Sequence, residues 1–565
     1  MTKKIIGHIR NQFKKLDIDG YVVPKNDEFF SEYSKKDRLK IVSNFSGSAG
    51  YAIILKNKNY LFVDGRYNIQ AKIESGDKFK IVSHQKIINC KLFKNLKLGI
   101  NPKLFTSNQI KKFFLRYNRV KYINFDLIEK KSNKQSENIK QFYSLEDEIV
   151  GENYKIKISK VRNFLKKNKS NFLFISAPDN VAWLLNIRGY DNPNSPVPNC
   201  NLLLDDKKNI YLVANKNKAK KILKDGKIKS NFIIEPKKFD KFIDTLKGKN
   251  IIIDTLTCSI FNETILSKKF RILKKKDPIY LLKAIKNKTE IKNMINAHIH
   301  DGVALTKFLY WIKEVNKKKI TEFEAQEKLE SFRKKNSNYL YPSFNTIMGS
   351  GKNAAIVHYR ATKDNTKIIE DKDILLCDSG GQYRYGTTDV TRTICFNKPN
   401  KNIKDIFTKV LKGHIAVVSS NLSKYNTGNS IDKRARKFLK KVNLDYSHGT
   451  GHGVGFFLNV HEGPQSISKF NNIKFSEGMI VSNEPGYYKK GQFGFRIENL
   501  IYVKKIKNKL FFENLTLAPI DKDLIDFKQL SKSEKNYLFK YNINVCDKLF
   551  KFLNKNEKKW LASFI

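Results

Sequence analysis

DILLCDSGGQYRYGTTDVTRTICF, residues 373–396, carries two aspartates that border apolar, strand-like runs. One apolar run ends at Asp378, and a second run follows Asp389. Gly380 and Gly381 favour a turn between the two runs. We therefore predict a β-hairpin that brings the two aspartates side by side.

A second pair of acids lies in EGMIVSNEPGYYKKGQFGFRIENLIYV, residues 477–503. Glu484 follows an apolar run, and Glu498 lies inside an alternating run at 495–503. The proline and glycines between them, at 485, 486, 491 and 494, exclude a continuous helix and favour an antiparallel return. Carboxylates brought this close raise one another's pKa unless cations neutralise them. The pattern therefore predicts bound metal.

Histidines gather in SHGTGHGVGFFLNVHEGP, residues 447–464, which holds three of the nine in the chain: His448, His452 and His461. A fourth, His358, lies in SGKNAAIVHYR shortly before the first aspartate pair. Neutral imidazoles can bind metal or carry protons. We expect the intervening glycines to bring backbone close to an ion or substrate and to adopt conformations closed to other residues. The other five histidines read as ordinary core or surface residues.

Any one of these acids taken alone reads as an ordinary surface residue on a strand. The chain, however, has 109 Lys and Arg against 54 Asp and Glu, so acids flanked by apolar residues and glycines are conspicuous. Four carboxylates and one imidazole suit hard cations such as Mn²⁺ better than structural zinc. The candidate site for two divalent ions comprises Asp378, Asp389, His452, Glu484 and Glu498. It predicts a hydrolase.

The order of these residues resembles aminopeptidase P, the Xaa-Pro aminopeptidase group of the pita-bread metallopeptidases. The similarity is strongest in the strings HGTGHGVG, NVHEGP, NEPGYY and FRIEN. It extends to VSNFSGSAGYAIIL, VDGRY, APDNVAWLLNIRG and PIYLLKAIKNKTEI, and so covers about residues 15–520. One departure is NDEFFSEY at 26–33, where a histidine is expected, and it concerns subunit contacts or the outer peptide pocket.

The resemblance implies which of the two metals each ligand binds. Asp378 would bind one metal only, Asp389 and Glu498 would bridge both, and His452 and Glu484 would bind the second. Two such metals lower the pKa of a shared water. Glu498 would also accept a proton from that water and pass it to the departing proline nitrogen.

The resemblance further implies catalytic roles for five neighbours. His358 and His461 would stabilise the carbonyl oxygen and the tetrahedral intermediate, and His448 would lie near the proline ring or move protons. Arg496 and Tyr488 would hold ligands and relay protons. From the residues alone, Arg496 could equally be a local ion-pair partner, Tyr488 could be packing, and His461 could form a surface pair with its neighbour.

The implied activity is release of the N-terminal residue from peptides whose second residue is proline, by a homodimer with two ions, Mn²⁺ being expected. Prolidase, which prefers dipeptides, is the alternative within the family. The intact ligand set disfavours the metal-free creatinase, and the large N-terminal half disfavours methionine aminopeptidase. A non-catalytic basic binding protein is the alternative from another class.

A three-domain α/β (α+β) organisation is expected for 565 residues. The resemblance implies two creatinase/prolidase-like N-terminal α/β domains that share a fold, at 1–151 and 152–288, and a pita-bread catalytic domain at 289–565. EDEIVGEN at 146–153 separates the first two, and Thr289 is predicted to cap the first helix of the third. The tail beyond Asp521 has helical periodicity and is expected to pack on the catalytic domain.

A formal net charge of +55 would ordinarily indicate nucleic acid or an anionic membrane. The excess is mostly lysine spread through every domain, without zinc-finger spacing, a ribonucleoprotein aromatic motif or a confined arginine cluster. We therefore expect solvated lysines, nonspecific attraction to polyanions and no specific nucleic-acid partner.

The six cysteines are far apart and form no C-x-x-C pair, which favours a reducing compartment. The basic N-terminus lacks the continuous apolar run of a removable signal. No stretch reaches the roughly 18 apolar residues of a membrane span. We expect a cytoplasmic protein.

Overall fold

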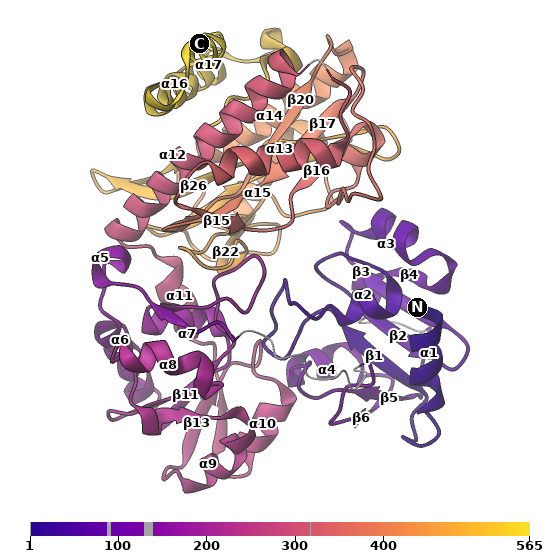
Figure 1. The fold of residues 1–565 in the computed structure, drawn as a ribbon, viewed down its shortest axis with the longest axis vertical. Coiled ribbons are helices and arrows are strands. Elements are labelled where there is room, and N and C mark those ends of the chain that lie inside the picture. Colours follow the sequence, from indigo (N-terminus) through magenta and orange to yellow (C-terminus); the bar gives the residue numbers. More distant parts are fainter. Residues whose placement is uncertain (1, 88–91, 129–138, 317) are drawn as a thin grey trace. The chain divides into compact units, whose positions relative to one another are not determined.

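The computed structural model describes residues 2–87, 92–128, 139–316 and 318–565 (Figure 1). The chain divides into two compact units, Met1–Tyr280 and Leu281–Ile565, and each is considered by itself. Among the described residues, no helix combines the length and the apolar character that a membrane crossing requires. Cys90 lies outside the described residues, and the other five cysteines are buried thiols.

The described part of the first unit contains two six-stranded sheets of the same topology. The first has the order β4-β3-β2-β1-β5-β6 and the second the order β12-β11-β10-β8-β13-β14. In each sheet the first strand along the chain pairs antiparallel with the second and parallel with the fifth. The expectation that the two N-terminal regions share a fold is thus confirmed.

Helices connect the strands of the first unit (Figure 1). The strands are β1 (Gly20–Pro24), β2 (Tyr51–Leu55), β3 (Asn59–Val63), β4 (Lys80–Ser83), β5 (Lys97–Ile100), β6 (Arg119–Tyr122), β7 (Tyr143–Ser144), β8 (Phe172–Ile175), β9 (Ile187–Arg188), β10 (Asn201–Asp205), β11 (Ile210–Val213), β12 (Ile233–Ile234), β13 (Asn250–Ile253) and β14 (Arg271–Lys274). The α-helices are α1 (Thr2–Asn11), α2 (Arg38–Ser43), α3 (Asn68–Ser75), α4 (Ser107–Phe113), α5 (Asp147–Val150), α6 (Tyr154–Lys167), α7 (Pro178–Leu185), α8 (Lys216–Lys224), α9 (Phe239–Thr245) and α10 (Ile260–Ser267), and α11 (Ile279–Ala284) spans the division between the units.

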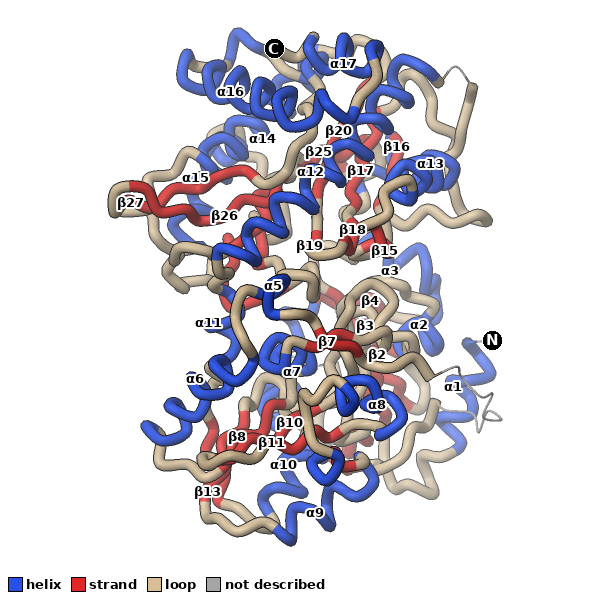
Figure 2. Tube along the Cα trace, turned by 60° about the vertical axis from the view of Figure 1, so that its left-hand side comes forward, coloured by secondary structure: helices blue, strands red, loops and turns tan. Residues whose placement is uncertain are grey.

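The second unit combines antiparallel sheets with long helices (Figure 2). Its strands are β15 (Tyr339–Pro342), β16 (Ile347–Ser350), β17 (Ile374–Ser379), β18 (Gly381–Tyr383), β19 (Gly386–Thr387), β20 (Val390–Cys395), β21 (Gly451–Gly453), β22 (Glu462–Ile467), β23 (Ile480–Asn483), β24 (Gly486–Lys489), β25 (Phe493–Arg496), β26 (Asn499–Ile506) and β27 (Lys509–Asn514). Its α-helices are α12 (Lys288–Tyr310), α13 (Glu322–Lys334), α14 (Lys401–Val418), α15 (Gly428–Lys440), α16 (Lys532–Leu549) and α17 (Lys555–Ala562).

Successive side chains of the central strand β17 point alternately into two apolar layers, one on each face of the sheet. Leu375 and Cys377 pack with residues of α12 and α13, whereas Ile374 packs with residues of α14 on the other face. Asp378 belongs to the alternate set with Ile374, because side chains in a strand alternate between faces. Cys377 therefore points away from Asp378.

The predicted turn at Gly380 and Gly381 is wrong. These glycines carry the chain from β17 directly into β18, and the turn follows at residues 384–385, between β18 and β19. A Cβ on Gly380 would lie 2.0 Å from the carbonyl oxygen of Thr388. Close approach of two backbone segments, rather than chain reversal, explains the glycine.

The start of α12 also differs from the prediction. Asn287, not Thr289, is the N-cap residue, and its side chain accepts from the backbone of Glu290 in a capping box. The cap depends on the residue with extended backbone before the first turn, which a choice of Thr by type alone misplaced. The tail prediction is confirmed, since α16 and α17 form an apolar cluster with residues of α12.

The end of α11 and the segment that follows it are anchored inside the second unit. The ammonium groups of Lys283 and Lys286 both lie against the Glu462 carboxylate, and all three side chains are buried. The division into domains at 151/152 and 288/289 stays a prediction.

Candidate functional site

The four predicted acids lie at the ends of paired strands. In the β17–β20 ladder Asp378 is opposite Thr391, and Asp389 directly precedes β20. In the β23–β26 ladder Asn483 is opposite Asn499, so that Glu484 and Glu498 follow and precede a matched pair. The antiparallel returns predicted for both acid pairs are confirmed.

The predicted continuous strand around Glu498 is wrong. β25 ends at Arg496 and β26 begins at Asn499 in another sheet. Between them the backbone N–H of Ile497 donates to the carbonyl of Pro485, and that of Glu498 donates to the carbonyl of Thr391. The chain thus changes hydrogen-bond partners, and Glu498 lies at this change.

His452 places its ring nitrogen between two of the acids. Its Nδ1–H donates to the carbonyl oxygen of Gly453 at 2.9 Å, which leaves Nε2 as the atom that faces the site. Nε2 lies 3.3 Å from Asp389 Oδ2 and 3.6 Å from Glu484 Oε1. Burial opposes a charge on the ring, but the two carboxylates prevail and raise the pKa of His452 to about 9. A cation is therefore favoured among these atoms.

The donor set fits a hard metal ion on the structure's own geometry. Ligand atoms of Asp389, His452 and Glu498 all lie within 4.8 Å of one another. Asp378 Oδ1 is buried without a hydrogen-bond partner in the described part of the chain. Burial and the neighbouring acids raise the pKa of Glu498 well above its ordinary value. Buried oxygens with unmet charge are what a divalent cation would satisfy.

A chain of hydrogen bonds leads from Asp378 away from the acids. Arg496 forms an ion pair with Asp378, and its Nη1–H donates to the Tyr488 hydroxyl at 2.6 Å. That hydroxyl lies 3.0 Å from Nε2 of His448, whose Nδ1–H donates to the Gly449 carbonyl at 2.7 Å. Burial lowers the pKa of His448 to about 4, so the ring is a neutral acceptor for the Tyr488 proton.

The other two predicted histidines lie at the edge of this cluster. The rings of His461 and His452 meet edge to face, with 4.3 Å between centroids. His358 is half-buried and follows Val357, whose carbonyl accepts from Arg496 at 3.4 Å. The structure thus brings the predicted ligands, histidines, Tyr488 and Arg496 into one region of the second unit.

The expected role of the glycines around His452 needs correction. None of the glycines at 449, 451, 453 and 455 has a positive φ, so they do not adopt conformations closed to other residues. A Cβ on Gly451 would instead lie 1.9 Å from the carbonyl oxygen of Ser482. The close approach serves packing of β21 against β23, which places His452 beside Glu484.

Sequence reasoning missed two residues that hold the acids. The hydroxyl of Thr391 donates to Glu498 at 2.7 Å and accepts from Arg496 Nε at 3.0 Å. His414 lies on α14, and its Nδ1 donates to the Asn483 carbonyl at 3.1 Å, one residue before Glu484. Thr391 could have been found from its place two positions after Asp389 on a strand, whereas His414 carries no local signal.

The stability of the metal-free protein should fall as pH rises. Burial, with Asp389 and Glu484, raises the pKa of Asp378 from 3.8 to about 7, although Arg496 opposes the shift. The folded state then holds a proton that the unfolded state has released, so unfolding free energy is lost between about pH 4 and pH 7. Divalent cations replace that proton. The rise in melting temperature on adding Mn²⁺ should therefore be larger at pH 8 than at pH 5.5.

Thermal melts at the two pH values, with and without Mn²⁺, measure this difference. Asp378→Asn, which cannot ionise, should reduce it, whereas Asp523→Asn at an exposed acid should not. An equal rise at both pH values in the unmodified chain would contradict the expectation.

Known proteins match this chain over its whole length. Residues 133–290 match the Creatinase/Prolidase N-terminal domain, residues 292–505 match Metallopeptidase family M24, and residues 508–563 match the C-terminal region of peptidase M24. Xaa-Pro aminopeptidase 1 of Dictyostelium discoideum is 36% identical, with 100% of this chain and 96% of that protein covered. A probable Xaa-Pro aminopeptidase P of Coprinopsis cinerea is 34% identical, with 99% and 97% covered.

Solved structures agree with these matches. The X-prolyl aminopeptidase of Caenorhabditis elegans, described as a cytosolic enzyme with a di-nuclear active site, is 27% identical, with a TM-score of 0.91 and 100% of this chain and 99% of that chain covered. The prolidase of Pyrococcus horikoshii is 28% identical, with a TM-score of 0.53 and 66% of this chain and 100% of that chain covered. Fold, site and matches define a metal-dependent hydrolase of peptide bonds. The chain belongs to metallopeptidase family M24.

Proposed function

We propose that this chain is an Xaa-Pro aminopeptidase, which releases the N-terminal residue from peptides with proline in the second position. The observation that carries the proposal is the site itself, in which three buried carboxylates, the half-buried carboxylate of Glu484 and His452 converge beside Arg496, Tyr488 and His448. Full-length similarity to Xaa-Pro aminopeptidases supports this activity over that of a prolidase, because the prolidase match covers only two thirds of the chain.

The ligands we assign are Asp378 to one divalent ion, Asp389 and Glu498 to both, and His452 and Glu484 to the other. When bound, such ions supply Lewis-acid polarisation of a carbonyl and lower the pKa of water. Mn²⁺ is proposed as the native ion, because four hard oxygen ligands outnumber one nitrogen.

The remaining chemistry is assigned to this chain's own side chains. Glu498 would take the proton of the attacking water, because its carboxylate lies among the assigned ligand atoms. It would pass that proton to the proline nitrogen, which must gain one to leave as an amine. His358 and His461 would hydrogen-bond to the carbonyl oxygen of the scissile bond as negative charge develops on it.

His448, Tyr488 and Arg496 would fix the geometry around the first aspartate. Arg496 holds both Asp378 and the Tyr488 hydroxyl, so the position of Asp378 and the direction of the Tyr488 proton are linked. The neutral ring of His448 accepts that proton at one end of the chain. This arrangement can orient a substrate, with the neutral imidazole of His448 as a fixed hydrogen-bond acceptor.

The test of the proposed function is an assay of the purified chain with Mn²⁺ on Arg-Pro-Pro, Arg-Ala-Pro and Arg-Pro. Release of arginine from Arg-Pro-Pro and not from Arg-Ala-Pro is expected, because specificity lies in the second residue. Cleavage of the dipeptide alone would indicate prolidase, and equal cleavage of both tripeptides would contradict proline specificity.

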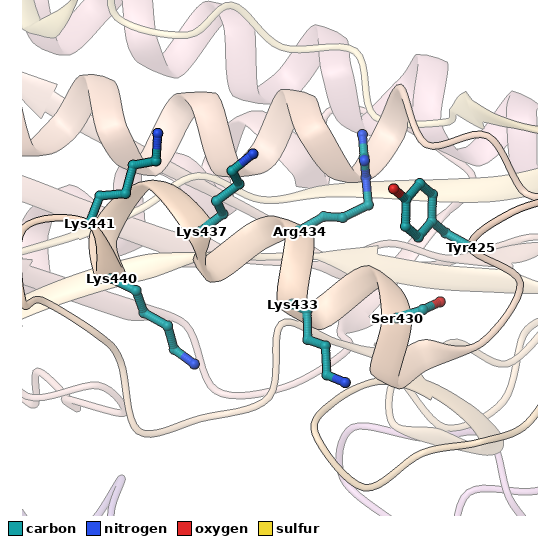
Figure 3. A pocket seen from close by; sticks show the side chains of 7 residues that line it. All are labelled: Tyr425, Ser430, Lys433, Arg434, Lys437, Lys440 and Lys441. Atoms are coloured by element: carbon teal, nitrogen blue, oxygen red, sulfur yellow. The ribbon is translucent and has the colours of Figure 1, made fainter.

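The alternative of a basic binding protein finds limited support on α15. Lys433, Lys437, Lys440 and Lys441 line a hollow of about 570 Å³, and Figure 3 shows their side chains leaving the helix in different directions. Arg434 covers the ring of Tyr425 at 4.5 Å, so that this ring is no free stacking platform. Such a surface suits nonspecific attraction to phosphates, which carries no sequence information.

We further propose a homodimer in the cytoplasm. The Caenorhabditis elegans neighbour is described as cytosolic, and the buried free thiols of this chain suit a reducing compartment. Sedimentation of the purified protein and fractionation of its source cells test these two points.

A further inference from the structure

The buried face of α15 carries an ion pair that the proposed mechanism does not use. Asp432 and Arg436 lie one helical turn apart, and both are buried, although the exposed face of the same helix carries the lysines of Figure 3. We propose that Arg436, held by Asp432, is a positioning residue that aims His448 at Tyr488. The proposal rests on the proposed function, in which His448 belongs to the catalytic region.

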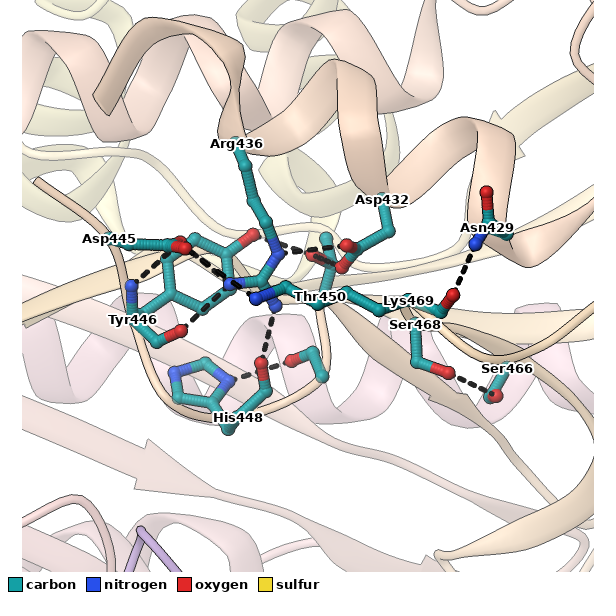
Figure 4. Close-up of polar contacts among 11 residues, drawn as sticks. Asn429, Asp432, Arg436, Asp445, Tyr446, His448, Thr450, Ser466, Ser468 and Lys469 are labelled. Atoms are coloured by element: carbon teal, nitrogen blue, oxygen red, sulfur yellow. Dashed lines mark hydrogen bonds and ion pairs between the residues drawn. The ribbon is translucent and has the colours of Figure 1, made fainter. Parts of the chain in front are cut away.

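The Arg436 guanidinium donates hydrogen bonds to three residues of the loop before β21. Its Nη2–H donates to the carbonyl of His448 at 2.6 Å, and its Nη1–H groups donate to the carbonyl of Tyr446 and to Asp445 Oδ1, each at 2.7 Å (Figure 4). Its Nε–H donates to Asp432 Oδ2 at 2.8 Å. Because the fork is planar and rigid, these contacts fix several backbone atoms at once.

Asp432 also contacts the end of this loop that lies next to the proposed metal ligands. Its Oδ1 accepts from the Thr450 hydroxyl at 2.6 Å, and the Thr450 carbonyl accepts from the backbone N–H of Glu484 at 2.8 Å. One buried carboxylate thus contacts both the arginine that holds His448 and the residue that binds the Glu484 backbone.

The imidazole of His448 has a defined direction only if its backbone is fixed. Its ring packs on Tyr446 with 4.9 Å between centroids, and Tyr446 in turn lies under the Arg436 guanidinium at 4.0 Å. The hydrogen bond from Tyr488 to Nε2 spans 3.0 Å and depends on that placement. Buried carbonyls of a loop need donors, and lysine at 436, with three N–H donors on a single nitrogen, could not reproduce the four contacts that the arginine fork makes.

The test compares Arg436→Lys with the matched control Arg434→Lys. Arg434 lies on the same helix and donates to Ser420 Oγ at 3.0 Å, remote from His448. Arg436→Lys should lower kcat on Arg-Pro-Pro by about 10- to 100-fold, the usual effect of losing a residue that supports a catalytic group. Arg434→Lys should keep wild-type kcat, and both variants should retain the wild-type metal content.

A double-mutant cycle separates positioning from general damage. In a His448→Ala background, Arg436→Lys should cause little further loss of kcat, because its effect passes through the missing imidazole. Equal losses in both backgrounds would overturn the proposal. So would unchanged kcat in the single variant.

A second readout does not depend on the assigned activity. With ¹⁵N-labelled histidine, Arg436→Lys should move the ring Nε2 resonance of His448, assigned by its absence in His448→Ala, and Arg434→Lys should leave it in place. An unmoved resonance overturns the positioning role even if the chain cleaves other peptides. A moved resonance without cleavage of Arg-Pro-Pro would instead contradict only the proposed function.

Discussion

Glu498→Ala is expected to lower kcat/KM by at least about 10⁴-fold, the order of loss seen when an essential member of a catalytic constellation is removed. A carboxylate oxygen of Glu498 lies within 4.8 Å of ligand atoms of Asp389 and His452. The substitution therefore removes an oxygen that we assign to both ions. It also removes the proposed acceptor of the water proton. Asp389→Ala should have a comparable effect for the first of these reasons.

Metal analysis and circular dichroism distinguish a loss of activity caused by lost metal from one caused by unfolding. The variant should bind fewer than two Mn²⁺ per chain yet keep a folded spectrum, because the backbone at residue 498 still donates to Thr391 and accepts from Arg392. Glu513→Ala, at a half-exposed acid that pairs with Lys504, is the control and should keep full activity. Wild-type rates in Glu498→Ala would contradict the assignment of the site.

Arg496→Met should lower kcat by about 10²- to 10³-fold, as expected for removal of one preorganised electrostatic contact. The guanidinium binds the Tyr488 hydroxyl, Thr391 Oγ1 and the Asp378 carboxylate, and methionine can replace only its length. In contrast with Glu498→Ala, metal content should be retained, because a positive charge is removed from beside the ligands.

Arg496→Lys is the matched variant for this residue. It keeps the charge but loses the planar fork, so it should recover only part of the lost rate. Kinetics of both variants on Arg-Pro-Pro, with metal analysis of the same samples, check the prediction. Full activity in Arg496→Met, or loss of both ions with it, would show that the Tyr488 and Asp378 contacts have another purpose.

Local pattern was sufficient for the strands and acid pairs of the site. Apolar runs that end at Asp378 and Glu484, with helix-breaking residues between the acids of each pair, predict antiparallel strands, and both ladders are present. The roles of individual ligands came from the family resemblance, since spacing alone does not say which atoms share an ion.

What the sequence did not predict depends on contacts between distant segments. The chain changes ladders at Glu498 because the Thr391 carbonyl, more than a hundred residues away, accepts its N–H. Gly380 was predicted to form a turn and Gly451 to bring backbone close to an ion or substrate, but neighbouring backbone leaves no room for a Cβ at either position. Asp432 and Arg436 look like an ordinary helix-surface pair at i, i+4 until burial is known.

The contacts of Lys283 and Lys286 with Glu462 limit where the chain can be cut to produce the catalytic half alone. A recombinant fragment that begins at the predicted boundary, residue 289, would lack Lys283 and Lys286 and would leave the carboxylate next to His461 buried without either cation. Breaking a buried pair in this way typically costs about 3–5 kcal/mol. An excised catalytic half should therefore retain the six residues that precede α12, which include the end of α11.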